Sequence, residues 1–181
     1  MSMRSVCVLC ILCIFGAGAP ALAGDGPDLR VTPIPRDGQV YVSFELSDGF
    51  SPDVKDAIQS GLPTTFSYEI ELRQSNALLD RTLASLTIDA SVRFDNLTRR
   101  YHMSRSVDGR VDDARPTEDS DAVRDWLTRF DRVPISTTAA LEPNAEYYVR
   151  VRALARPRSS WFAGVLGRGA VLGNAKFTFL P

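Results

Sequence analysis

Apolar and polar residues alternate along several segments of the chain, a pattern that predicts strands with one buried face. In residues 66–72, the side chains of Phe66, Tyr68, Ile70 and Leu72 are separated by a serine and two glutamates. The alternating segments are 40–46, 66–72, 86–95 and 147–154. Antiparallel strands with one solvated face have this alternation, with apolar residues inward and polar residues outward.

Turn residues separate these segments. Asp37-Gly38 precedes the first alternating segment and can take the positive φ values that a tight hairpin needs. Residues 94–98 (FDNLT) contain the polar residues of a second turn between long strands. We therefore expect antiparallel neighbours along the chain.

Two helices are predicted between the strands. The first covers 51–61, where Ser51 is a suitable N-cap, Pro52 fits the first turn and Gly61 fits a left-handed end. Its buried stripe is Val54, Ala57 and Ile58.

The second helix is predicted near 118–131, with acidic residues at its start, where the helix dipole favours them. Its apolar side is Ala122, Val123, Trp126, Leu127 and Phe130, and Pro134 follows its expected end. The preceding residues, 106–121, are polar and rich in turn residues, so we predict a surface loop there.

The C-terminal part predicts a pair of strands. Tyr147, Val149, Val151 and Ala153 share one face, and residues 174–180 are expected to pair with 146–155. Leu141, Pro143 and Tyr147 have the spacing of a tyrosine corner, in which a tyrosine hydroxyl bonds to upstream backbone. This part resembles the end of a fibronectin type III or immunoglobulin-like domain. The predicted fold is mainly β, an antiparallel immunoglobulin-like β-sandwich with two short helical insertions.

The first 23 residues have the order of a secretory signal peptide. Arg4 precedes an uncharged apolar stretch, and Ala21-Leu22-Ala23 predicts cleavage before Gly24. The prediction is therefore a signal peptide over 1–23 and one domain over 24–181, in a periplasmic or secreted protein; an uncleaved N-terminal anchor is the alternative. All three cysteines lie in the leader, so the expected domain depends on a packed core rather than disulfides.

The segments VKDAIQSGLPTTFSYEIEL, LLDRTL and VRFDNLTRRYHMSRS resemble the bacterial family of domain of unknown function 4390. The matching residues are Ala57, Ile58, Ser60, Gly61, Pro63, Tyr68, Ile70, Glu71, Leu72, Phe94, Asp95, Leu97, Thr98 and Tyr101. Phe177 and Phe179 stand where the family usually has tryptophans. The resemblance implies an exported protein, without assigned catalytic residues, that is associated with sensor-kinase gene neighbourhoods.

No catalytic, cofactor-binding or metal-binding residue is assigned from the sequence. His102 is the only histidine, and alternation with Tyr101 and Met103 places it on the outer face or at the sheet edge. Calcium bound by the acidic residues of 106–121 is an alternative to a solvated loop. Those acidic residues are Asp108, Asp112, Asp113, Glu118, Asp119 and Asp121. Without Arg4 the net charge is −2, which offers no concentrated basic surface for nucleic acid.

The segment 156–173 connects the last two strands and is long for a hairpin loop. The notable possibility is contact with a partner or a lipid surface, since tryptophan and arginine are enriched at both. The residues concerned are Trp161, Phe162, Val165, Leu166, Arg156, Arg158 and Arg168. The alternative is a loop that folds over one end of the sandwich and shields its core.

The leading hypothesis is a non-enzymatic envelope protein that acts as a binding or adaptor module. Its expected partner is an unknown envelope protein, with a sensor kinase as the candidate. The alternative is a carbohydrate-active or hydrolase-like module that uses Glu69, Glu71 and Asp89 on a sheet face. We expect these acids instead to pair across strands with basic residues such as Arg150 and Arg152. A purely structural envelope component is a third hypothesis.

Overall fold

The computed structural model describes residues 27–76, 79–157 and 170–180. Among these residues, no helix is both long enough and apolar enough to cross a membrane. The strands are β1 (Asp28–Arg36), β2 (Gln39–Ser47), β3 (Thr64–Gln74), β4 (Arg81–Asp95), β5 (Arg100–Val107), β6 (Arg110–Thr117), β7 (Arg129–Thr137), β8 (Glu146–Pro157) and β9 (Val171–Thr178). The helices are α1 (Pro52–Gln59) and α2 (Ser120–Thr128), with a 3₁₀ turn at Thr138–Ala140.

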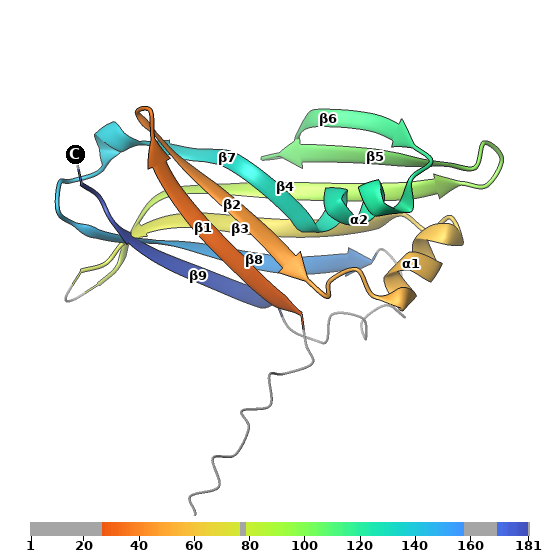
Figure 1. Cartoon of the computed structure of the whole chain (residues 1–181), viewed down its shortest axis with the longest axis horizontal. Coiled ribbons are helices and arrows are strands. Elements are labelled where there is room, and N and C mark those ends of the chain that lie inside the picture. Colours follow the sequence, from red (N-terminus) through yellow and green to blue (C-terminus); the bar gives the residue numbers. More distant parts are fainter. Residues whose placement is uncertain (1–26, 77–78, 158–169, 181) are drawn as a thin grey trace, which may run out of the picture.

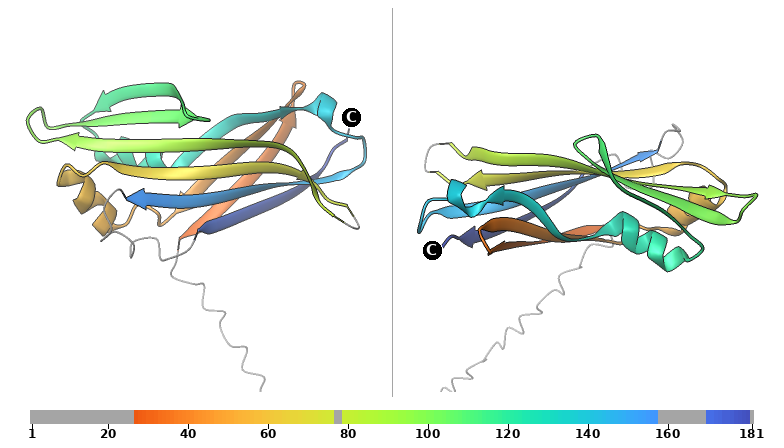
Figure 2. Two further views of the ribbon diagram at one scale, coloured as in Figure 1. Left: turned by 180° about the vertical axis from the view of Figure 1, so that it is seen from behind. Right: turned by 90° about the horizontal axis from the view of Figure 1, so that it is seen from above.

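The strands form two antiparallel sheets that face one another, as in a sandwich (Figure 1). The small sheet has the order β1-β2-β7, and the large sheet has the order β6-β5-β4-β3-β8-β9. Seen from above in Figure 2, the small sheet and α2 lie on one side of the large sheet. The prediction of a mainly β fold with two short helices is confirmed.

The predicted hairpins have the expected backbone. Asp37 and Gly38 have φ values of 51° and 76°, which suit the tight turn between β1 and β2. The turn between β4 and β5 is held by the Asp95 carboxylate, which accepts from the Leu97 amide at 2.9 Å. Because these turns are short, β1 pairs with β2 and β4 pairs with β5, and β3 to β6 form a continuous meander.

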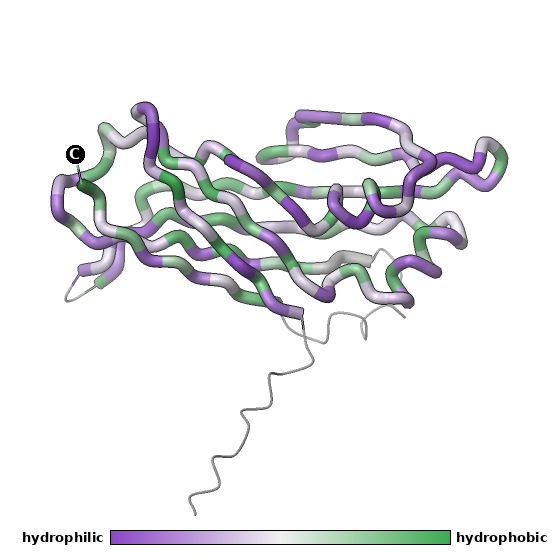
Figure 3. Tube along the Cα trace, in the orientation of Figure 1, coloured by the Kyte–Doolittle hydropathy of each residue, from purple (hydrophilic) through white to green (hydrophobic). Residues whose placement is uncertain are grey.

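The core lies between the sheets and consists of the inward residues of the alternating segments. Tyr68 of the large sheet contacts Phe44 and Phe130 of the small sheet, with ring centroids 5.1 and 4.9 Å apart. The other large core side chains with almost no exposed surface include Phe66, Ile70, Leu72, Val40, Val42, Val92, Leu127 and Tyr147. Along the tube in Figure 3, hydrophobic and hydrophilic positions alternate in the central strands. Burial of these inward faces is the main stabilising contribution.

The predicted start and end of α1 are confirmed. The Ser51 hydroxyl accepts from the Val54 amide at 3.4 Å, and Gly61 has the left-handed φ of 86°. The predicted buried stripe of α1 is buried in the structure. It packs over the end of β3 and β4, and its Pro63 exit leads directly into β3.

The C-terminal pairing and the tyrosine corner geometry are also confirmed. The hydroxyl of Tyr147 in β8 accepts from the Glu142 amide at 2.7 Å, so it bonds to backbone five residues upstream. β8 pairs with β9 in the register Glu146↔Thr178 to Ala153↔Val171. This places β9 at one edge of the large sheet, beneath β1 in Figure 1.

Two sequence predictions are wrong. Residues 106–121 do not form a loop, because Arg110–Thr117 is β6, which pairs with β5 as the edge strand of the large sheet. The helix predicted to 131 ends at Thr128, and Phe130 belongs to β7. Arg129 already has the extended φ and ψ of −119° and 135°. Pro134, expected beyond the helix, lies within β7 next to an irregularity in its pairing with β2.

Candidate functional site

The large sheet has an outer face that none of the described elements covers. In the reverse view of Figure 2, this face points toward the reader, with the small sheet behind it. Its side chains are the polar members of the alternating segments. They include Thr65, Ser67, Glu69 and Glu71 of β3, Asp89, Ser91 and Arg93 of β4, and His102, Ser104 and Ser106 of β5. Strand alternation therefore brings most polar candidates onto one surface.

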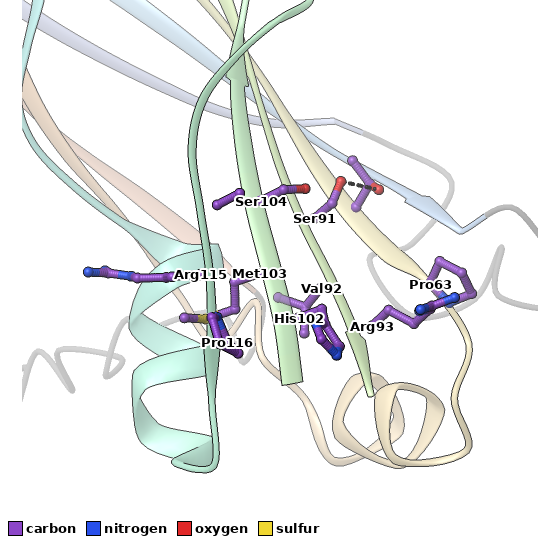
Figure 4. Close-up of a pocket in the computed structure, with 11 residues that line it drawn as sticks. Pro63, Ser91, Val92, Arg93, His102, Met103, Ser104, Arg115 and Pro116 are labelled. Carbon is purple, nitrogen blue, oxygen red and sulfur yellow. Dashed lines mark hydrogen bonds between the residues drawn. The ribbon is translucent and has the colours of Figure 1, made fainter. Parts of the chain in front are cut away.

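An open depression of about 500 Å³ lies on this face, where β3, β4, β5 and β6 are neighbours (Figure 4). One row of small side chains crosses it. The strand registers place Thr65 opposite Ser91, Ser91 opposite Ser104, and Ser104 opposite Ala114. The next row carries the larger side chains of Arg93, His102 and Pro116. The depression exists because a row of small residues lies beside a row of large ones.

The hydroxyls of the small row are close enough to interact. Thr65 Oγ1 and Ser91 Oγ are 2.8 Å apart, so one of them donates to the other. Only one of the two protons is used in that bond, and the structure gives the Ser104 hydroxyl no partner among the described residues. The floor of the depression therefore offers hydrogen-bond donors to a ligand.

Two basic side chains flank the hydroxyls. Arg93 and His102 are opposite one another on β4 and β5, and Figure 4 shows both at the same end of the depression. His102 Nε2 lies 3.9 Å from Asp95 Oδ2, whereas Arg93 forms no ion pair within the described part of the chain. The side chain of His102 is half exposed, so its predicted outward position is confirmed.

Among the described residues, no acidic side chain lines the depression. The carboxylate beside His102 is that of Asp95, which is engaged at the β4–β5 turn. Hydrogen bonds from the Leu97 amide, then from Thr98, lower the pKa of Asp95 below its ordinary value. Arg115 also lines the depression, but its guanidinium turns away and lies 4.7 Å from the centre of the Trp126 ring. The basic groups facing the depression are therefore Arg93 and His102.

A second hollow of about 660 Å³ lies beside the β4–β5 turn. Its lining combines Arg99 with Glu118, and Glu118 is already bonded to Arg100 at 2.9 Å. Because both charge signs are present and partly paired, this hollow has no bias toward one class of ligand.

The acids of the hydrolase hypothesis are engaged by neighbouring strands. Glu69 pairs with Arg152 at 3.2 Å, and Glu71 lies 3.8 Å from Arg150. Asp89 accepts from the Ser67 hydroxyl at 2.5 Å. The predicted cross-strand pairs with Arg150 and Arg152 are thus confirmed, and Asp89 pairs with serine instead. None of these three acids lines the depression.

The acidic residues predicted for calcium are spread over a hairpin and a helix start. Asp108 accepts from the Thr87 amide, and Asp119 caps α2 by accepting from the Asp121 amide, each at 2.8 Å. Glu118 bonds to Arg100, and Asp121 lies 3.4 Å from Arg124. In the described ranges, no group of three or more acidic, histidine or cysteine residues is arranged for a metal ion. The calcium alternative receives no support from this geometry.

A buried polar cluster, which sequence reasoning missed, lies on the inner face at the end of α2. The Arg105 guanidinium is 4.2 Å from the centre of the Trp126 ring and 4.1 Å from that of Phe130. It donates to the carbonyls of Trp126 at 2.6 Å and Arg129 at 3.0 Å. Burial, then the nearby Arg115, lowers the pKa of Arg105. The sequence contains one signal for this cluster: Arg105 follows Tyr101 and Met103 at the inward positions of the alternation.

Tyr68 completes this cluster by donating to the Leu127 carbonyl at 2.6 Å. Burial raises the pKa of Tyr68 far above its ordinary value, and the charge of Arg105 opposes this. Tyr68 and Arg105 together occupy the carbonyls that the end of a helix leaves free. Tyr68 and Trp126 are buried and Arg105 is partly buried, and the bonds from Tyr68 and Arg105 go to the backbone of α2 and Arg129. The cluster therefore positions α2, although Arg105 Nε and Trp126 Nε1 have no hydrogen-bond partner among the described residues.

The predicted contact residues Trp161, Phe162, Val165, Leu166, Arg158 and Arg168 lie outside the described residues. The backbone of Arg156 lies in β8, where the register places it opposite Thr65. Contact by this segment stays a prediction.

A family model described as domain of unknown function (DUF4390) matches residues 29–160. This range contains every residue that lines the depression. No curated protein matches the chain. No solved structure matches it either, so the likeness to fibronectin type III and immunoglobulin-like domains finds no support in the comparisons.

Proposed function

The chain belongs to the DUF4390 family, and we propose that it is an exported, non-enzymatic binding or adaptor module of the cell envelope. Its recognition surface is the outer face of the large sheet. The observation that supports this most is the depression, where the Ser104 hydroxyl and the Arg93 guanidinium have no partners among the described residues. These donors can bind the acceptor atoms of a ligand in place of water.

The rest of the outer face differs from the depression. Toward β8, the charged residues satisfy one another across strands, as Glu69 does with Arg152. Exposed pairs of this kind contribute little to stability and leave few groups for a ligand. The part of the sheet near β5 and β6 is the part whose donors remain available. This contrast favours a localised site at the β6 end.

The proposed partner is an envelope protein, and the family resemblance makes a sensor kinase the candidate. We further propose that the protein is periplasmic or secreted, with cleavage before Gly24. Intact-mass measurement of the protein from the envelope fraction distinguishes cleavage from the uncleaved anchor.

The fold is proposed to be immunoglobulin-like in its finer topology, supported by the tyrosine corner of Tyr147.

Site-specific photo-crosslinking tests the recognition surface. A photoreactive residue is placed at Ser104 in the depression, and a control is placed at the exposed Thr32 on the small sheet. We expect an adduct of defined mass from position 104 in intact cells, identified by mass spectrometry, and a much weaker one from position 32. Equal adducts at both positions, or none at 104, contradict the proposal.

The hydrolase alternative makes a separate prediction. If Glu69 and Glu71 were an acid–base pair, E69Q and E71Q would abolish hydrolysis of envelope polysaccharide while leaving the crosslink at position 104 intact. The binding proposal expects no hydrolysis in the unmodified protein and no effect of either substitution on the adduct.

A further inference from the structure

We propose that the depression binds a phosphate group, held by Arg93 and His102 together with the hydroxyls of Ser91 and Ser104. This inference rests on the proposed function, because it names the ligand chemistry of the same surface. It is carried by three features of the lining: the kind of hydrogen-bonding groups, their spacing and their charge.

The lining side chains are biased toward donors. Arg93 is a donor only, and Ser104 and one hydroxyl of the Thr65–Ser91 pair have protons to give. In the described part of the chain, Asp and Glu, which only accept when ionised, are absent from the lining. A phosphate oxygen is an acceptor that also has negative charge, so a phosphate matches the unpaired Arg93 guanidinium better than a neutral sugar does.

The four side chains are spaced for one small tetrahedral group. Ser91 is opposite Ser104 and Arg93 is opposite His102, so each pair spans about 5 Å between Cβ atoms. The two pairs are separated by two residues along each strand, which is about 7 Å. A phosphate with hydrogen bonds of about 2.8 Å fits within a rectangle of these dimensions.

The charge of the depression has the sign that a phosphate requires. Arg93 has no ion pair among the described residues, although the chain as a whole has slightly more acidic than basic residues. Elsewhere on the same face, Arg150 and Arg152 lie beside glutamates. A guanidinium is a preferred partner for phosphate because its planar set of donors can contact two oxygens at once.

Phosphate in the envelope has two sources, a soluble anion and a lipid headgroup. The purified protein is titrated with inorganic phosphate at constant ionic strength, using chloride as the reference, and amide shifts are followed by NMR. In a second arm, the protein is floated with vesicles of phosphatidylglycerol or of phosphatidylcholine. Binding in the first arm alone indicates a soluble ligand, and binding to phosphatidylglycerol as well indicates a headgroup.

The variants are R93Q and S104A, with R110Q as a charge-matched control. Arg93 and Arg110 are both exposed, but Arg110 lies at the β5–β6 turn and does not line the depression. We expect phosphate to shift the amides of residues 91, 93, 102 and 104. We expect R93Q to weaken binding about tenfold or more, S104A about threefold, and R110Q less than twofold.

Absence of binding in both arms overturns the inference, and so does equal binding by R93Q and R110Q. The native NMR spectrum of each variant shows that it is folded. If phosphate fails to bind while position 104 still crosslinks to a partner, the phosphate inference fails and the proposed function stands. If phosphate binds but no adduct forms, the adaptor function fails and the phosphate site stands.

Discussion

Tyr68 and Arg105 both reach from the large sheet to backbone carbonyls at the end of α2. The bond to the Leu127 carbonyl is buried, the bond to the Trp126 carbonyl is partly buried, and the bond to the Arg129 carbonyl is exposed. No other described side chain donates to these carbonyls. Removing the donor to a buried carbonyl destabilises the fold by more than the net strength of the bond, because water cannot take the place of the donor. The two side chains therefore contribute to stability by donating hydrogen bonds to carbonyls that would otherwise lack a partner.

Tyr68→Phe removes one hydroxyl and leaves the Leu127 carbonyl without its donor. We expect the free energy of unfolding to fall by about 1–3 kcal/mol, measured by urea denaturation. Tyr41→Phe is the control, since Tyr41 is only partly buried and its hydroxyl has no hydrogen bond to another described residue, and its change is expected within about 0.5 kcal/mol. Equal effects of the two substitutions would show that the Leu127 bond contributes nothing.

Arg105→Met and Arg115→Met separate burial from ring contact, because both guanidiniums lie against Trp126. A methionine side chain at position 105 cannot donate to the two carbonyls, and the guanidinium contacts with two rings are lost, so we expect a loss of about 2–4 kcal/mol. Arg115 is exposed and makes no such hydrogen bond to the described residues, so its loss is expected below about 1 kcal/mol. Urea denaturation of both variants decides this, and a larger effect at position 115 would refute the role of burial.

At the scale of elements, alternation predicted the strands that have one face in the core and one in solvent. β2, β3, β4 and β8 were found in this way, and the turn at Asp37-Gly38 was found from its turn residues. Alternation also placed Ser91, Arg93 and His102 on the outer face. It did not reveal the depression, which depends on the register that brings Ser104 opposite Ser91 and on the neighbouring strand β6.

The two missed elements have physical explanations. Nearly every residue of β6 is exposed, because it is an edge strand that extends beyond the small sheet, so it has no apolar alternation to detect. Its charges and Pro116 are typical of edges that avoid pairing with other chains. In β7, Phe130 follows Trp126 and Leu127 at helical spacing, and this coincidence extended the predicted helix. Tyr68 and Arg105 contact carbonyls at the end of α2. These contacts join residues that are far apart in the sequence, so the sequence pattern does not reveal them.

The junction of β1 with β9 makes a prediction at this scale. A Cβ at Gly173 would overlap the Leu29 carbonyl oxygen and contact the side chain of Val31, so glycine permits the two sheets to approach here. Gly173→Ala must move β1 away from β9, and we expect a loss above about 2 kcal/mol in urea denaturation. Asn174→Ala, at the adjacent exposed position, is the control and should change stability by less than about 0.5 kcal/mol. A neutral Gly173→Ala would contradict this close packing.

At the scale of the whole molecule, the two faces of the large sheet have different tasks. Its inner face is apolar and is covered by the small sheet and both helices, so it supplies the core. Its outer face contributes little burial, and its residues are therefore less constrained by packing. A depression on that face can hold donors without partners because a rigid sheet, stabilised from behind, fixes their positions. Stability and recognition are thus divided between opposite sides of the same strands.

Two carboxyl groups with lowered pKa values predict how acid affects the stability of the fold. A hydrogen bond from the Tyr148 hydroxyl at 2.7 Å lowers the pKa of Asp80, and the Leu97 amide lowers that of Asp95. A carboxyl whose pKa is lower in the folded state stabilises it fully above the unfolded value, about 3.9, and this contribution is lost as the pH falls through the folded value. We expect the melting temperature to fall below about pH 4, measured by circular dichroism from pH 6 to pH 2.

The double variant D80N/D95N tests the origin of this acid sensitivity. Its melting temperature should fall less steeply below about pH 4, because neither side chain can then release or bind a proton. D112N/D131N is the matched control, since Asp112 and Asp131 are exposed and the structure gives their side chains no hydrogen bond or ion pair within its described residues. It should keep the acid slope of the unmodified protein. Identical slopes for both double variants would place the acid sensitivity elsewhere in the molecule. Because Asp95 lies beside His102, D95N should leave phosphate binding at neutral pH unchanged or tighter, which links this stability measurement to the site on the outer face.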